Sequence, residues 1–164
     1  MGLDITAYKK LKEVKNPKWD EYGEELLNWE TEICFGASMD WSEKNFKGRG
    51  EGVDSKKVYS WEETYEFRAG SYSGYNWWRD MLNIFSNTLN NTENPFYELI
   101  DFADNEGVIG NVVSQKLYKD FVDNENKAIE FSKSINDGEH WLNKYYQWKM
   151  AFEYAKENGA VEFH

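Results

Sequence analysis

The three arginines of this chain are the residues whose type and placement point most directly to chemistry. Arg68 and Arg79 bracket the short segment Ala-Gly-Ser-Tyr-Ser-Gly-Tyr-Asn-Trp-Trp, and Arg49 lies between two glycines. All the other cationic side chains are lysines. Because only the planar guanidinium offers a two-pronged set of donors, arginines beside glycine and serine indicate an anion-binding site.

The segment between the two arginines adds backbone donors and flat rings. Gly70 and Gly74 let N–H groups approach a ligand closely, and a helix beginning here would add free N–H groups and a partial positive charge. Aromatic rings stack on a base or receive a guanidinium. Phosphate binding with stacking is the recognition chemistry of a nucleotide. The candidate ligand-binding residues are Arg49, Arg68, Gly70, Ser71, Tyr72, Ser73, Gly74, Tyr75, Asn76, Trp77 and Arg79.

A structural interpretation of the same segment stays open, in which it is a tight turn from a strand to a helix. Arg68 and Arg79 would then pair with nearby acids, and Tyr75 would belong to the core. Those acids are Glu62, Glu66 and Asp80. A nucleophile elbow does not fit, because Tyr72 stands where that motif needs serine. A Gly-x4-Gly-Lys phosphate loop is absent, which argues against ATP-driven chemistry.

Three acids form a second candidate site. Asp101, Asp104 and Glu106 precede Gly107, and oxygen-rich loops suit Ca²⁺ or Mg²⁺. A metal beside a phosphate would make hydrolysis possible. The alternative is that these acids form a turn and cap the next helix at its positive end.

The remaining residues with reactive side chains give weaker indications. His140 and His164 are the only histidines, and neither has a nucleophile placed beside it by the sequence. Cys34, the single cysteine, lies between Ile33 and Phe35, so we expect it to be packed rather than reactive. No cofactor is expected.

Composition narrows the class of protein. The 164 residues carry a net charge of −11 and are 18% aromatic, which fits one folded domain, residues 1–164. An acidic chain is unsuited to duplex DNA or anionic lipid. No apolar run reaches membrane-spanning length, and no signal peptide is recognisable. We therefore expect a soluble protein of the bacterial cytoplasm.

Residue patterns predict strands first and helices later. Strands are expected near residues 3–8, 26–35, 57–61, 64–68 and 160–163, with a loop over residues 36–52. Helices are expected from Ser71 or Ser73 to about Leu89, and over residues 95–102, 108–121 and 139–156. The third helix either breaks near Asn124 or continues. This order indicates an α+β fold, with a small, mainly antiparallel sheet packed against about four helices.

Four stretches together resemble a family of small proteins encoded by tailed phages and prophages. They are MGLDITAYKKLK, FRAGSYSGYNWWR, DFADNEGVIGNVVSQKLYKDF and AFEYAKENGAVEFH. The resemblance implies a phage accessory protein that works in a bacterial host, and it transfers no activity and no catalytic residue. Small phage proteins without replication or virion signatures are often inhibitors of host defence.

Three functions follow as hypotheses. The first is a binding protein, a sponge, that sequesters a phosphorylated, nucleotide-derived immune signal. The second is an acidic inhibitor of a host defence protein, which mimics nucleic acid as an anti-CRISPR does. The third is a small metal-dependent phosphoesterase. The chain has more tryptophan than a small core needs, so Trp41 or Trp77 could mark an interface, and a homodimer is a further expectation.

Overall fold

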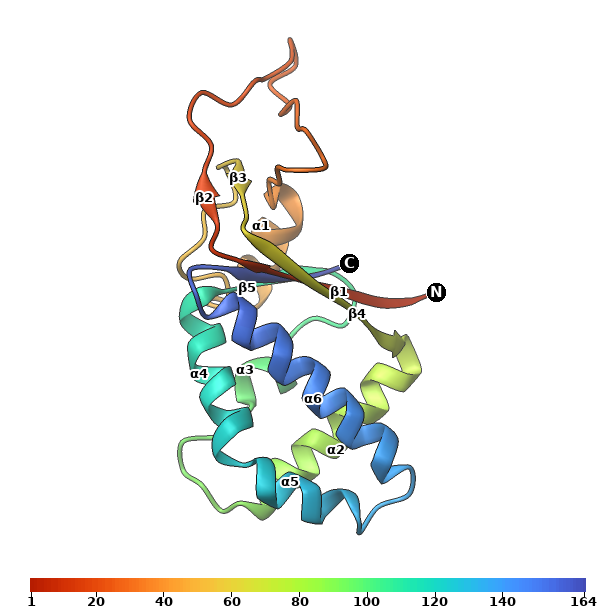
Figure 1. The fold of residues 1–164 in the computed structure, drawn as a ribbon. Coiled ribbons are helices and arrows are strands. Elements are labelled where there is room, and N and C mark those ends of the chain that lie inside the picture. Colours follow the sequence, from red (N-terminus) through yellow and green to blue (C-terminus); the bar gives the residue numbers. More distant parts are fainter.

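The computed structural model describes residues 1–164 and has an α+β fold built on a four-stranded antiparallel sheet (Figure 1). The strand order is β4-β1-β6-β5, and a two-stranded pair, β2-β3, lies beside it. The strands are β1 (Gly2–Lys9), β2 (Lys12–Glu13), β3 (Tyr59–Ser60), β4 (Glu63–Ser71), β5 (Gly107–Gly110) and β6 (Ala160–Phe163). The predicted fold class is confirmed.

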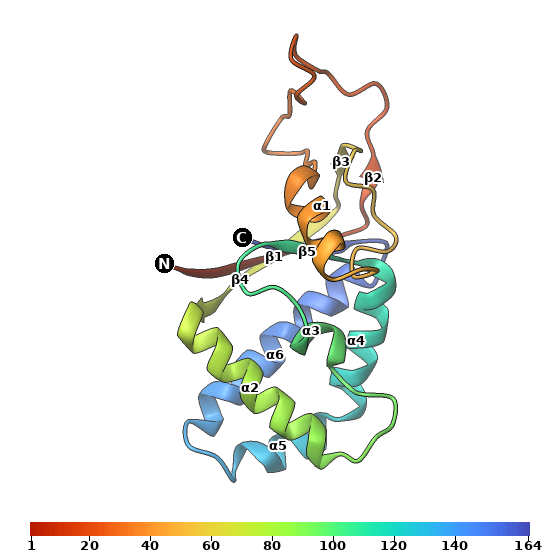
Figure 2. The same ribbon diagram turned by 180° about the vertical axis from the view of Figure 1, so that it is seen from behind.

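Helices cover the two faces of this sheet unequally. Figures 1 and 2 show α2 to α6 on one side, with α1 and the β2-β3 pair on the other. The helices are α1 (Gly36–Asn45), α2 (Tyr72–Thr88), α3 (Tyr97–Ile100), α4 (Asn111–Asp123), α5 (Glu125–Ser132) and α6 (Gly138–Ala155). No helix is both long enough and apolar enough to cross a membrane.

The main core lies between the sheet and α2 to α6. In β1, Leu3, Ile5 and Ala7 point toward the helices because successive strand side chains alternate between faces. From α6, Trp141 and Trp148 belong to the same buried cluster and have no exposed surface. Burying each of these side chains stabilises the fold by roughly 1.5–3 kcal/mol. The cluster and the partly buried residues packed against it contain most of the chain's aromatic residues.

A reciprocal pair of hydrogen bonds fixes α2 against α6. The indole N–H of Trp78 donates to the Trp141 carbonyl at 3.1 Å, and the indole N–H of Trp141 donates to the Trp78 carbonyl at 3.3 Å. Buried indole N–H groups usually have such partners, although that of Trp148 has none. The position of α2, which begins at the segment between Arg68 and Arg79, is therefore set by the core.

A second, smaller core covers one end of the opposite sheet face. Tyr8 on β1 contacts Phe35 and Trp61 edge to face. The buried members of this cluster are Tyr8, Leu11, Ile33, Phe35, Met39, Val108 and Ala160. It holds α1 and the β2-β3 pair on the sheet.

Three expected elements differ from the structure. The predicted strand 26–35 is wrong: apart from a bridge between Ile33 and Tyr59, nothing pairs with it. The predicted loop 36–52 contains α1, whose only buried residues, Met39 and Ser42, leave no apolar stripe to detect. The predicted helix 108–121 begins as strand β5, because Val108 and Ile109 pair with β6.

Candidate functional site

The candidate ligand segment is the connection between β4 and α2. The Ser71 hydroxyl accepts a hydrogen bond from the Gly74 N–H at 3.0 Å, so Ser71, one of the two serines considered for the helix start, is the cap. Gly70 has a φ of +142°, a conformation that residues with side chains rarely adopt. The glycines and serine of this segment therefore have structural roles in the turn.

Arg68 is neutralised within its own sheet. Its Nη1 donates to both carboxylate oxygens of Asp4, at 3.1 and 3.0 Å. The two residues are register partners on β4 and β1, and both side chains are about half exposed. The acid is contributed by the neighbouring strand, and not by Glu62, Glu66 or Asp80.

Arg79 fastens α2 to the loop before β5. Its Nη1 donates to the carbonyl of Phe102, and its Nη2 donates to the Asn76 side-chain oxygen at 2.7 Å. The Asn76 amide in turn donates to Asp104 at 3.0 Å. The guanidinium carbon lies 5.2 Å from the centre of the Tyr75 ring. The guanidinium is thus bound to groups of the chain itself.

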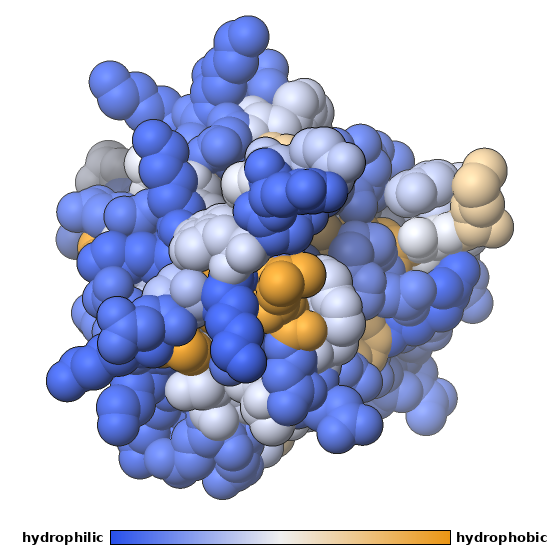
Figure 3. All heavy atoms as spheres, turned by 90° about the horizontal axis from the view of Figure 1, so that it is seen from above, coloured by the Kyte–Doolittle hydropathy of each residue, from blue (hydrophilic) through white to orange (hydrophobic).

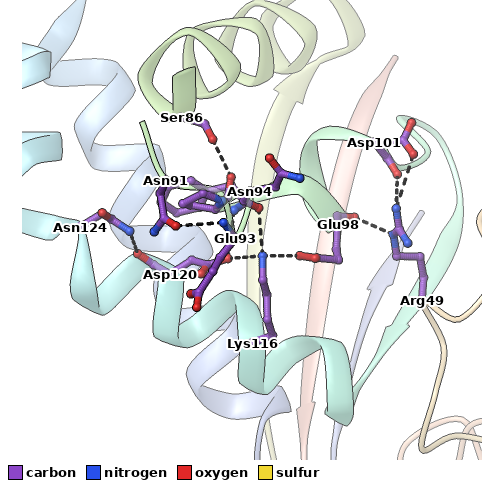
Figure 4. Close-up of polar contacts among 12 residues, drawn as sticks. Arg49, Ser86, Asn91, Glu93, Asn94, Glu98, Asp101, Lys116, Asp120 and Asn124 are labelled. Carbon is purple, nitrogen blue, oxygen red and sulfur yellow. Dashed lines mark hydrogen bonds and ion pairs between the residues drawn. The ribbon is translucent and has the colours of Figure 1, made fainter. Parts of the chain in front are cut away.

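Arg49, which lies between α1 and β3 in the chain, also binds the loop before β5 (Figure 4). Its Nε donates to the Glu98 carbonyl at 3.0 Å, and its Nη2 lies 3.1 Å from the carbonyl and 3.5 Å from the carboxylate of Asp101. The Tyr97 ring lies against it, with 5.4 Å from ring centre to guanidinium carbon. Only 12% of the Arg49 side chain is exposed.

A lysine completes this network from α4. The Lys116 ammonium lies 2.8 Å from the Glu98 carboxylate and 2.7 Å from that of Asp120, and it donates to the Asn94 carbonyl at 3.1 Å (Figure 4). Asp120 also accepts from the Phe96 N–H at 2.9 Å. Burial raises the pKa of Asp120 above its ordinary value despite these bonds. The residues from 89 to 106, hereafter the α2–β5 connection, are thus held by cations from three directions.

The three arginines, grouped from the sequence as candidate ligand-binding residues, do not converge on one cavity. Arg49 and Arg79 bind adjoining residues of the α2–β5 connection, and neither lines any of the five main cavities. Arg68 lines a shallow hollow of about 360 Å³, together with its partner Asp4. Arg49 and Arg79 are therefore committed to the fold, whereas Arg68 is paired with Asp4 and about half exposed.

The aromatic residues of the candidate site also fail to form one exposed group. Tyr75 is fully buried, and burial raises the pKa of its hydroxyl. Trp77 is half-buried and stacks on His140, with ring centres 6.3 Å apart. Tyr72 is 39% exposed, and the Ser73 hydroxyl lies 3.2 Å from that of Ser71. No flat, accessible pair of rings faces the turn.

The acidic candidates do not form a metal site. Asp101 accepts from the Tyr97 hydroxyl at 3.0 Å as well as from Arg49, and Asp104 accepts from Asn76. Glu106 is exposed and has no side-chain partner. No group of three or more His, Cys, Asp or Glu side chains is arranged to hold a metal ion.

His164 and Cys34 both have hydrogen-bond partners within the chain. His164 Nε2 lies 2.9 Å from the Thr6 hydroxyl. The Cys34 thiol donates to the Ser55 carbonyl at 3.3 Å, and burial raises the pKa of this thiol, with a further contribution from the charge of Glu25. A thiol held in its protonated form is a poor nucleophile, as the sequence indicated.

A surface that the sequence did not identify lies in residues 15–32, hereafter the arm. Figures 1 and 2 show it protruding from the sheet beyond α1 and the β2-β3 pair. Four large apolar side chains in it meet solvent: Trp19 is 45% exposed, Tyr22 82%, Leu26 56% and Trp29 75%. Seen from the arm's end of the molecule, a hydrophilic surface is interrupted by pale and orange residues (Figure 3).

The arm is folded by its own hydrogen bonds. At its tip, the Asp20 carboxylate accepts from the backbone N–H groups of Tyr22 and Glu24, and the Leu26 N–H donates to the Lys18 carbonyl at 2.8 Å. Side chains of this kind fix turns by bonding to nearby backbone. The aromatic side chains are therefore presented on a shaped support rather than on an unstructured chain.

A second turn in the arm follows the same principle. The Asn28 side chain accepts from the Glu30 N–H at 3.2 Å, and the Glu32 carboxylate accepts from the Asn28 N–H at 3.2 Å. Trp29 lies inside this turn. The most exposed tryptophan is thus held by bonds on both sides of it.

Negative charge surrounds these apolar groups. The arm has six acidic residues and two lysines. At its base, Glu25, Asp40 and Asp54 all lie close enough to raise the pKa of Cys34. Beside them is a hollow of about 460 Å³ whose acidic lining residues are Asp40, Glu43, Glu51 and Asp54. The arm and this hollow together present an acidic surface with aromatic groups on it.

The sequence contained part of this signal. Trp41, proposed as an exposed residue, is 38% exposed, whereas Trp77 is half-buried. The alternation of Leu27, Trp29, Thr31 and Ile33 on one face was interpreted as a strand over residues 26–35. The density of acids around Trp19 and Trp29 was the cue that could have indicated exposure instead.

Comparison with known proteins identifies no relative of this chain. No protein-family model, no curated protein and no solved structure matches it. Function must therefore be inferred from the residues themselves.

Proposed function

We propose that this protein is a non-catalytic binding protein, and that its arm docks onto a basic surface of a partner protein. The observation that carries the proposal is the exposure of Tyr22 and Trp29, at 82% and 75%, within a segment that is held by its own hydrogen bonds. An internally bonded support keeps such groups in place for a partner, which lowers the entropic cost of binding.

The energetics favour a protein partner. Burying one large apolar side chain contributes roughly 1.5–3 kcal/mol, and folding leaves this contribution unused at Trp19, Tyr22, Leu26 and Trp29. Tryptophan and tyrosine are the residues that most often dominate protein–protein interfaces. The arm thus carries anchors of the right kind, and α1 adds Trp41 near its base.

Charge indicates which partner would fit. The arm's acids outnumber its lysines by six to two, so a basic surface would be attracted and an acidic one repelled. Complementary charge speeds encounter and fixes orientation, and its effect falls as salt is added. This is the chemistry of the acidic inhibitor considered from the sequence.

The arginine geometry supports this function over a nucleotide sponge. A ligand phosphate at Arg49 or Arg79 would have to displace hydrogen bonds to Asp101 or Phe102 that hold the fold. The metal-dependent phosphoesterase has no ligand set to support it. The resemblance to phage accessory proteins directs the search for a partner to basic proteins of a bacterial host, including those of its defence systems.

Capture and calorimetry on matched variants test the proposal. The arm variant carries Trp19→Ser, Tyr22→Ser and Trp29→Ser. The control carries Ile84→Ser, Val122→Ser and Met150→Ser, whose side chains are 47%, 42% and 40% exposed outside the arm. A basic protein retained from bacterial lysate by wild type and control, and lost by the arm variant, is purified and titrated in rising salt.

The expected result is binding that weakens with salt and falls at least about a hundredfold in the arm variant, since two anchors of about 1.5 kcal/mol each are worth that much. Equal affinity of the arm variant and the control would refute the proposal. A tight complex with a nucleotide that is lost in Arg68→Ala would favour the sponge instead.

A further inference from the structure

The two edges of the four-stranded sheet have different surroundings. On β5, the Gly110 N–H donates to the Arg49 carbonyl at 2.8 Å, and the Val108 N–H donates to the Ser42 hydroxyl at 3.2 Å. That edge is covered by α1 and the loop after it. On β4, β1 lies on one side and no strand lies on the other. An uncovered strand edge offers backbone groups to another strand.

Hydrogen bonds of β1 show which groups of β4 are free. Asp4 and His164 exchange backbone bonds, at 2.8 and 3.0 Å, so Asp4 directs its N–H and C=O toward β6. Because these directions alternate along a strand, Ile5 and Ala7 direct theirs toward β4. The Glu62 N–H, which donates to the Lys9 carbonyl at 3.0 Å, agrees with this alternation.

The register then identifies the outward groups. Phe67 and Tyr65 are paired with Ile5 and Ala7, so their backbone groups are used within the sheet. Thr64, Glu66 and Arg68 direct theirs outward. Of these, the Arg68 carbonyl accepts from the Lys144 ammonium, and the other outward groups have no partner in the chain. Their side chains lie on the sheet face that the large helices do not cover.

We propose that two copies of the chain join through their β4 strands, antiparallel and with the two-fold axis at Phe67, into one continuous sheet. In this register Glu66 of each copy lies opposite Arg68 of the other, and the two exchange backbone hydrogen bonds. The Arg68 carbonyl, which accepts from Lys144, accepts from the Glu66 N–H with its second lone pair. Opposite charges placed directly across a strand pair are favourable. Arg68 bonds to Asp4 through Nη1 alone, which leaves the rest of its guanidinium for the second carboxylate.

Charge selects both the register and the occupant. An axis at Glu66 would place the two Glu66 side chains opposite each other, which is unfavourable. The complementarity arises only when the strand meets its own copy, because one strand then supplies both the acid and the base. The edge also carries Lys144 and Arg68 beside Glu63 and Glu66, so it is nearly neutral in a chain whose net charge is −11. The interface is independent of the arm.

Charge exchange between copies tests the interface. Size-exclusion chromatography with light scattering should give wild type twice the chain mass of 19.4 kDa. Glu66→Arg and Arg68→Glu should each give the single mass, since each places like charges opposite one another. An equimolar mixture of the two variants should return to the doubled mass, because every opposed pair is then attractive.

Two controls keep the outcome interpretable. Glu63→Arg makes the same change of charge on the other face of β4 and should keep the doubled mass. Hydrogen exchange at the Glu66 amide should slow as wild-type concentration rises, which reports the pairing without any substitution. A wild type that stays at the single mass, or a mixture that fails to recover the doubled mass with both variants folded, overturns the proposal.

Discussion

The arm and the α2–β5 connection are similar in sequence and opposite in structure. Residues 15–32 and 89–106 have equal length and one proline each, and both have three aromatic residues amid five or six acids. In the connection, Phe96 is 0% and Phe102 3% exposed. In the arm, Trp29 is 75% exposed. Composition alone does not separate a connection that buries two of its three aromatic residues from an arm that exposes all three.

The cations that reach each segment account for the difference. Arg49, Arg79 and Lys116 approach the connection from the loop after α1, from α2 and from α4, and they bind its carbonyls and carboxylates. No ion pair joins the arm to the rest of the chain. A polar segment is drawn into the core where cations satisfy its oxygens, because unsatisfied polar groups are costly to bury. Without them its aromatic groups stay available to a partner.

The largest effect is expected at Arg79. Arg79→Ala leaves the Phe102 carbonyl and the Asn76 side chain without their donor, so the free energy of unfolding should fall by about 3 kcal/mol. Urea denaturation measures this. Arg79→Lys should recover only part of the loss, since one ammonium does not reproduce two divergent guanidinium bonds. An unchanged urea midpoint in Arg79→Ala would mean that this guanidinium does not hold the α2–β5 connection and is free for a ligand. The contrast with the arm would then be refuted.

Arg49 should matter less, because part of its contact is with the Asp101 carboxylate, which is 55% exposed. Arg49→Ala should lower the free energy of unfolding by about 2 kcal/mol, mainly through the lost bonds to the Glu98 and Asp101 carbonyls. The covering of the β5 edge should loosen too, so hydrogen exchange at Gly110 should quicken. Stability equal to wild type would show that the connection does not depend on this arginine.

Asp120 gives the connection a pH dependence. Burial raises the pKa of Asp120 in the folded protein, so the unfolded chain releases this proton at lower pH. The contribution of Asp120 to stability is therefore greatest below the unfolded value of about 3.8 and is lost as pH rises through the folded pKa. Asp120→Asn should gain stability relative to wild type across that window in denaturation at several pH values. A loss of stability in Asp120→Asn relative to wild type across that window would contradict this pH dependence.

The smallest effect on stability belongs to the arm. Trp29→Ser should change the free energy of unfolding by no more than about 0.5 kcal/mol, because an exposed side chain contributes little to the fold. Thermal denaturation beside Trp141→Ser, which should be severely destabilised, makes the contrast plain. A substantial loss at Trp29 would place the arm within the folded core.

How far the sequence predicts this molecule depends on the distance between interacting residues. The periodic patterns of α2 and α6 and the alternation of β1 are local, and they were predicted, as was a start of α2 at Ser71 or Ser73. Arg79 has one local partner, Asn76, but the partners of the other arginines are distant: Arg49 meets Asp101 and Arg68 meets Asp4, each more than forty residues away. A cluster of arginines could therefore be recognised, but not the acids and carbonyls that occupy them.

The arm failed to be predicted for a related reason. Alternation at residues 26–35 is the pattern of a strand, but a strand also needs a neighbour, and only Ile33 has one. The sequence does not show whether such a neighbour exists. The exposure of Trp29, and with it the proposed docking surface, follows from that missing partner.

One variant tests whether the arm serves binding and not folding. The Leu26 N–H bonds to the Lys18 carbonyl, so residues 19–25 can be replaced by Asn-Gly, the favoured two-residue hairpin turn, together with Leu26→Ser and Trp29→Ser. The free energy of unfolding of this variant should stay within about 1 kcal/mol of wild type, and calorimetry should detect no binding to the basic partner. A variant that unfolds, or that binds the partner as wild type does, would contradict it.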